Sequence, residues 1–139
     1  MTQPNSNWVE RKVLREQSVT ANAPDVWQSA RAAVLSVCDS FNKFSADGSD
    51  ADTEVRNGHF LQVSIRLKKQ SGDSVIRRVA IQFDQRKAII SVTVDGATPK
   101  VFPIKADENH CFVEFDGKEI TPDRFSEIAL SDALYKKPS

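Results

Sequence analysis

The feature that most constrains this chain is a succession of short strand-like segments separated by turns of only a few residues. Asn57-Gly58 is a dipeptide typical of a two-residue hairpin, and Asp95-Gly96 and Asp116-Gly117 mark further tight turns. Parallel neighbours need crossovers of about a dozen residues, so these segments must pair antiparallel. The segments with strand-like alternation are 53–56, 59–67, 75–83, 88–94, 101–106 and 110–115.

The segment from Pro24 to about Lys43 predicts a long helix. Its apolar residues recur at the helical period and form one continuous stripe. Pro24 suits the first helical turn, and Asn22 is the expected cap. The stripe contains Val26, Trp27, Ala30, Ala33, Val34, Val37, Cys38 and Phe41.

A second, shorter helix is expected near the C-terminus. Thr121 is its predicted cap, Pro122 its first residue and Asp123 an acid favourably placed in the first turn. The expected inner face consists of Phe125, Ile128, Ala129 and Ala133, and Lys136, Lys137 and Pro138 are expected to end the helix.

Residues 8–20 fit two structures. Val9, Val13 and Gln17 have helical spacing, whereas Val13, Arg15, Gln17 and Val19 alternate as in a strand. We favour a strand, because the β-branched pair Val19-Thr20 fits a strand end before the turn at Ala21–Pro24.

The predicted fold is therefore α+β: a curved antiparallel meander of about six to seven strands, packed by a long N-terminal and a short C-terminal helix. Residues 1–7 are expected to be flexible and residues 8–137 to form a single domain.

Composition excludes several classes of protein. The 139 residues carry 19 basic and 19 acidic side chains, so net charge does not favour nucleic acid or an anionic membrane. No segment is apolar enough for a membrane span, and no export signal is seen at the N-terminus. Cys38 and Cys111 are expected to be reduced thiols. We expect a cytoplasmic location.

Arg77 is the most informative single candidate for a binding site. It is flanked on its strand face by Val75 and Val79, so an inward-facing guanidinium must be paired or line a cavity. One interpretation is an anchor for an anionic ligand. The other is an arginine that reaches solvent or pairs with an acid from a helix.

Metal and catalytic sites are not expected. Asp47, Asp50, Asp52 and Glu54 form an acidic loop, but neither register places a glutamate at the twelfth position of a calcium-binding loop. The two histidines, His59 and His110, have no convergent partners in the sequence, although Cys38 is left open as a spatial neighbour of His110. We expect no cofactor, and we do not expect an enzyme.

Basic pairs recur along the predicted sheet at Lys68-Lys69, Arg77-Arg78 and Arg86-Lys87. A nucleic-acid surface would combine such charges with exposed aromatic residues, and only Phe60 is a candidate there. We interpret the charges as a solvated sheet face that discourages edge pairing.

The stretch Ser18–Trp27 resembles the entry of START-like, helix-grip ligand-binding proteins, in which a strand ends in an Ala-Pro turn before a helix carrying Val-Trp. The resemblance implies a cavity between the sheet and the C-terminal helix for a lipid-like or aromatic molecule. The single long helix here and the short C-terminal helix depart from that family. They suit a TBP-like sheet or a small chaperone-like dimer equally well.

Two functions follow as hypotheses. The first is a non-catalytic binding or protein-interaction module that contacts its partner through the sheet edge or a helix surface, with a homodimer left open. The alternative is a small-molecule carrier for a hydrophobic or anionic ligand, with Arg77, Trp27 and His110 as candidate ligand-binding residues.

Overall fold

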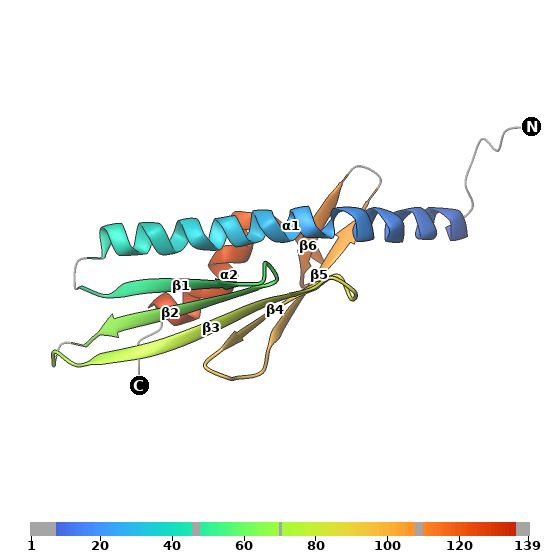
Figure 1. Ribbon diagram of the computed structural model, residues 1–139. Helices are drawn as coiled ribbons and strands as arrows, with labels where there is room; N and C mark the ends of the chain where they lie inside the picture. Colours follow the sequence, from blue (N-terminus) through green and yellow to red (C-terminus); the bar gives the residue numbers. More distant parts are fainter. Residues whose placement is uncertain (1–7, 46–47, 70, 108–109, 136–139) are drawn as a thin grey trace, which may run out of the picture.

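The computed structural model describes residues 8–45, 48–69, 71–107 and 110–135, which form two helices and one seven-stranded sheet (Figure 1). The helices are α1 (Trp8–Phe44) and α2 (Pro122–Tyr135). The strands are β1 (Asp50–Arg56), β2 (Phe60–Lys68), β3 (Ser74–Asp84), β4 (Ile89–Val94), β5 (Lys100–Ala106), β6 (Cys111–Phe115) and β7 (Lys118–Ile120).

The sheet is an antiparallel meander in which every strand pairs with the next one along the chain. This confirms the predicted fold class. The hairpins form where the turn dipeptides predict them: Asn57 and Gly58 have φ angles of 43° and 75°, the left-handed conformation that a type I′ turn requires. Asp116 and Gly117 do the same between β6 and β7. The sequence analysis missed β7 itself.

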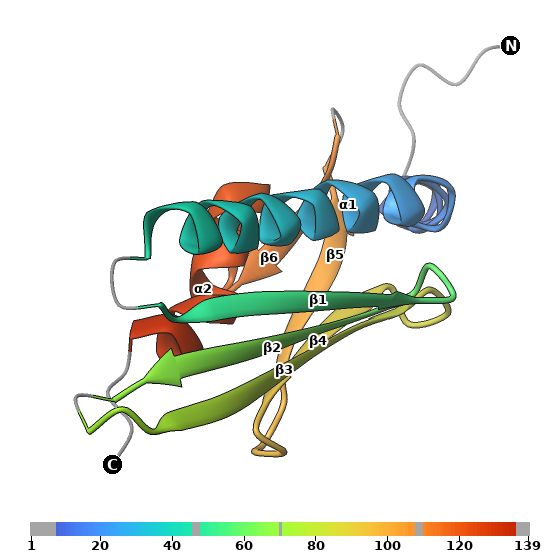
Figure 2. The same cartoon turned by 60° about the vertical axis from the view of Figure 1, so that its left-hand side comes forward.

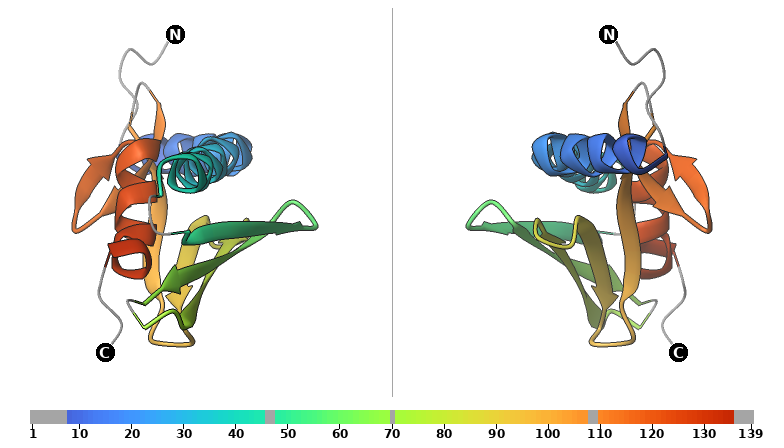
Figure 3. Two further views of the ribbon diagram at one scale, coloured as in Figure 1. Left: turned by 90° about the vertical axis from the view of Figure 1, so that its left-hand side faces the viewer. Right: turned by 90° about the vertical axis from the view of Figure 1, so that its right-hand side faces the viewer.

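The sheet curves strongly, and α1 lies along its concave side (Figures 2 and 3). α2 contacts α1, β2 and β3, so both helices cover the same face. The core between these layers is apolar. Its largest fully buried side chains are Trp27, Phe102, Phe125, Leu61, Ile65, Ile81, Ile90 and Leu130.

The prediction of a strand over residues 8–20 is wrong. The first helix does not begin at Pro24; α1 begins at Trp8 and runs through Pro24 without a break (Figure 1). The chain stays helical there because Ala23 and Trp27 on either side of the proline are buried in the core. Burial of this face outweighs the backbone hydrogen bond that a proline removes from a helix interior.

Most of the segment predicted to be an acidic loop is part of a strand. β1 begins at Asp50, whose carboxylate accepts a hydrogen bond from Arg66 at 2.7 Å on the neighbouring strand. Asp52 and Glu54 lie in the same strand. Asp47 lies outside the described residues.

The C-terminal helix begins as predicted. The Thr121 hydroxyl accepts a hydrogen bond from the Arg124 backbone N–H at 3.1 Å, which is the expected capping interaction. Phe125, Ala129 and Ala133 are buried and Ile128 is half-buried, in agreement with the predicted inner face.

The predicted end at Lys136–Pro138 and the predicted flexible start at residues 1–7 lie outside the described part of the chain. Neither described helix has a stretch long and apolar enough to cross a lipid bilayer.

Candidate functional site

The N-terminal part of α1 extends past the sheet, and a groove forms where this part crosses β5. Figure 1 shows the helix running beyond β5 and β6, with the β3–β4 turn beneath it. Residues 8–17 are all exposed, and burial begins at Ser18 and Val19. The groove has a volume of about 360 Å³, and its floor contains buried Ile104 and half-buried Val19 and Ala88.

The groove is strongly basic. Lys12 and Arg15 line it from α1, Arg86 and Lys87 from the β3–β4 turn, and Lys105 from β5. All five side chains are exposed. The single acidic residue in the lining is Glu16. Opposing elements therefore bring five positive charges and one negative charge to one concave surface.

Four cations elsewhere in the described chain form ion pairs with carboxylates. Arg56 pairs with Glu54, Arg66 with Asp50, Lys100 with Asp132, and Arg124 with Glu127. Within the described part of the chain, none of the five groove cations forms an ion pair with a carboxylate. Their charge is therefore available to a ligand.

The turn that carries Arg86 and Lys87 is fixed by local contacts. The Asp84 carboxylate accepts a hydrogen bond from the Lys87 backbone N–H at 3.1 Å. Ala88 adopts a φ of 52°, which bends the chain back toward the sheet. Its carbonyl accepts a hydrogen bond from the Ile104 N–H at 2.8 Å and so joins the turn to β5. This wall of the groove is consequently pre-organised.

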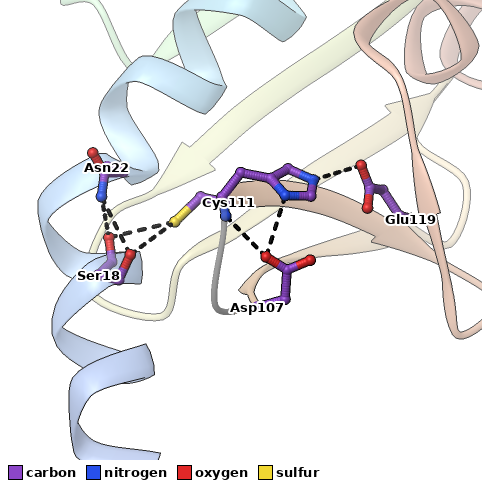
Figure 4. A network of polar contacts seen from close by, with 6 residues as sticks. Ser18, Asn22, Asp107, Cys111 and Glu119 are labelled. Carbon is purple, nitrogen blue, oxygen red and sulfur yellow. Dashed lines mark hydrogen bonds and ion pairs between the residues drawn. The ribbon is translucent and has the colours of Figure 1, made fainter. Parts of the chain in front are cut away.

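The opposite wall is held where α1 meets β6 (Figure 4). The Cys111 thiol donates to the Ser18 carbonyl at 3.4 Å and lies 3.5 Å from the Ser18 hydroxyl. Asn22 donates to the same carbonyl at 2.8 Å from one helical turn further along. Ser18 immediately precedes Val19 of the groove floor, so these contacts position α1 at the inner end of the groove.

The three candidate ligand-binding residues are not brought together. The Trp27 side chain is buried, stacks on Phe83, and donates from Nε1 to the Gly58 carbonyl at 2.6 Å. Arg77 lies six residues from Phe83 along the same strand, a separation of about 20 Å. Its guanidinium donates to the Asp132 carbonyl of α2 at 3.4 Å, and its Nε is buried without a partner among the described residues.

His110 lies at the start of β6 and is exposed. Its Nε2 is 2.7 Å from Glu119 and its Nδ1 is 3.2 Å from Asp107, so a carboxylate faces each ring nitrogen. The hydrogen bond with Glu119, supported by the nearby charge of Asp107, holds the pKa of His110 above its ordinary value. His110 also lines a cleft of about 290 Å³ together with Val26 and Ile120.

Asp107, His110 and Glu119 are the one group in the described chain whose side chains could together hold a metal ion. Their ligand atoms all lie within 4.8 Å of one another. The carboxylates occupy opposite ring nitrogens, however, and one ion contacts only one nitrogen of an imidazole. The observed geometry is that of an imidazole ring held between two carboxylates. The sequence analysis missed Asp107 and Glu119, which approach His110 only through the β5–β6 and β6–β7 connections.

Within the described chain, neither thiol forms a hydrogen bond with a histidine. The Cys111 side chain points toward Ser18 (Figure 4), away from the acids that hold His110. Cys38 follows Ser18 by twenty residues along α1, so about 30 Å of helix separates it from this region. Burial raises the pKa of the Cys38 thiol to about 11, so it is protonated and unreactive at neutral pH.

Sequence reasoning also missed the groove. It treated Arg86-Lys87 as part of a solvated sheet face and placed Lys12 and Arg15 on a strand. The helical spacing of Val9, Val13 and Gln17 was the available signal for α1.

Comparison of the chain with protein-family models, with curated proteins and with solved structures finds no match. The resemblance to START-like proteins therefore stays a prediction.

Proposed function

We propose that the protein is a non-catalytic interaction module that binds an acidic segment of a partner protein in the basic groove. The observation that carries this proposal is the convergence of Lys12, Arg15, Arg86, Lys87 and Lys105 on one concave surface without carboxylate partners among the described residues.

Electrostatics supports an anionic occupant. Like charges around one groove repel one another, and a bound carboxylate replaces part of this repulsion by attraction. A concave surface lined by one sign of charge also concentrates ligands of the opposite sign and accelerates their association. Because the lining side chains are exposed, the attraction is screened by salt.

A protein segment suits the groove better than nucleic acid. Proteins that bind single strands combine basic grooves with successive aromatic platforms. In the described chain, only one strongly exposed Trp, Phe or Tyr side chain, that of Trp8, lies near this end of α1. The other, Phe44, lies at the far end of the helix, about 54 Å away.

Isothermal titration calorimetry with octaglutamate at low ionic strength tests the proposal. The wild-type protein should bind the peptide, and the double variant Lys12→Glu/Arg86→Glu should bind it about tenfold more weakly, because two attractions become two repulsions. The matched control Arg78→Glu/Lys118→Glu makes the same charge change outside the groove. This control should bind octaglutamate more tightly than the groove variant does, with an affinity near that of the wild type.

Two outcomes contradict the proposal. The first is equal weakening in both double variants, which would indicate a response to net charge alone. The second is tighter binding of an oligothymidylate than of octaglutamate, with the same dependence on Lys12 and Arg86, which would indicate a nucleic-acid site.

The small-molecule alternative stays a prediction. It requires a cavity beside Arg77 with Trp27 in its lining, and these two residues lie far apart in the fold. Native mass spectrometry of the purified protein is the measurement that tests it.

A further inference from the structure

The exposed ring of Trp8 lies in line with the basic groove. Lys12, Arg15 and Val19 follow Trp8 in α1 by four, seven and eleven residues, a spacing that places all four on one helix face. Along the axis Lys12 is about 6 Å from Trp8, Arg15 about 10 Å and Val19 about 17 Å. Since the last three line the groove, Trp8 stands at its outer end.

Trp8 is free to contact a ligand. Its side chain is 68% exposed and has no hydrogen bond or ring contact within the described chain. Half of the large apolar side chains that are exposed in the described chain occur in the first two turns of α1: Trp8, Val9, Val13 and Leu14. A tryptophan beside a charged groove combines the two residue types that dominate binding energy at protein interfaces, aromatic rings and arginine.

We propose that the acidic segment bound in the groove also carries a large apolar residue that packs on Trp8. This inference rests on the proposed function and specifies the partner: an apolar side chain next to a run of acidic residues.

The spacing of the groove sets the expected order of these residues. An extended chain advances about 3.4 Å per residue and every second side chain shares a side. Acids two and four positions from the apolar residue therefore face α1 with it, about 7 and 14 Å further along, within reach of Lys12 and Arg15. Successive side chains of an extended segment point to opposite sides. Acids that face away from α1 therefore meet Arg86 and Lys87 on the other wall.

Two peptide compositions of equal charge, each made in two orientations and so four peptides in all, test the inference by calorimetry. Each has seven glutamates and one terminal residue, phenylalanine in the first and alanine in the second, and each is made with the terminal residue at either end. The phenylalanine peptide should bind about fivefold more tightly in one of the two orientations, because its ring is buried against Trp8.

The variant Trp8→Ala should abolish this preference and leave the affinity for the alanine peptide unchanged. Leu14→Ala is the matched control: Leu14 is 58% exposed in the same part of α1, but six residues of helical rotation place it on another face. Leu14→Ala should keep the preference. Circular dichroism melting confirms that both variants are folded.

Intrinsic fluorescence gives an independent readout. Trp27 is only 2% exposed, so acrylamide quenching in the free protein reports mainly Trp8. The phenylalanine peptide should protect Trp8 more than the alanine peptide does. Equal affinities, or a preference that survives in Trp8→Ala, overturn this inference while leaving the acidic groove in place. Failure of both peptides to bind overturns the proposed function and this inference together.

Discussion

At the scale of single residues, two side chains link the hairpins to the rest of the fold in different ways. Trp27 joins α1 to the β1–β2 turn through a part-buried hydrogen bond to Gly58, and to β3 through its ring contact with Phe83. At the surface, His110 joins the β5–β6 connection to β7 through Asp107 and Glu119. The first interaction contributes to stability through packing and the second through charge, so they respond to different perturbations.

The substitution Trp27→Phe should destabilise the protein by about 1–3 kcal/mol. It removes the indole N–H that donates a hydrogen bond to the Gly58 carbonyl, and it leaves a small void in the core. Urea unfolding measures the change in the free energy of unfolding. Trp8→Phe is the control at an exposed position and should change it by less than about 0.5 kcal/mol. Equal effects at both positions would contradict the assignment of Trp27 to the core.

The contribution of His110 to stability should depend on pH. Its pKa is raised in the folded protein, first by the hydrogen bond with Glu119, so the imidazolium form stabilises the fold. This stabilisation is complete below the pKa of the unfolded chain, about 6.5, and is lost as the pH rises through the folded pKa.

Urea unfolding of the wild type and of His110→Gln at a series of pH values checks this dependence. The difference between their free energies of unfolding should shrink as the pH rises from about 5.5 to about 8.5. An NMR titration should show that Glu119→Gln lowers the pKa of His110. A difference in stability that stays constant over this range would contradict the role of the ion pairs.

At the scale of elements, the long helix is the main departure from what the sequence predicts. Pro24, the β-branched pair Val19-Thr20 and the alternation at Val13–Val19 all favour a strand and a turn locally. Those local preferences are overridden because α1 buries Ala23, Trp27 and Ala30 against the sheet. By contrast, the hairpins were predictable because Asn57-Gly58 and Asp116-Gly117 determine turn geometry within two residues.

The substitution Pro24→Ala tests the continuous helix. Proline in a helix interior costs up to about 3 kcal/mol relative to alanine, and alanine restores the missing N–H, so the free energy of unfolding should rise by about 1–3 kcal/mol. Pro122→Ala is the control, because Pro122 is the first residue of α2, where the N–H needs no partner within the helix. It should change stability by less than about 0.5 kcal/mol. Destabilisation by Pro24→Ala would support a turn at this position instead.

At the scale of the whole molecule, positive and negative charges are equal in number but unevenly distributed over the surface. Nineteen basic and nineteen acidic side chains give no net charge, yet five cations gather at one end of the molecule. The sequence could not reveal this groove, because Lys12 and Arg15 precede Arg86 and Lys87 by more than seventy residues and meet them only when α1 crosses β5. The fold class was accessible from local pattern, whereas the candidate site depends on tertiary approach.

The measurement that most directly tests the basic groove is a map of backbone amide chemical shifts during titration with octaglutamate at low salt. We expect the largest shifts to cluster at residues 12–20, 86–88 and 104–106, and we expect added salt to reverse them. Shifts of equal size around Arg78 and Lys118, or shifts concentrated in the cleft beside His110, would contradict this expectation.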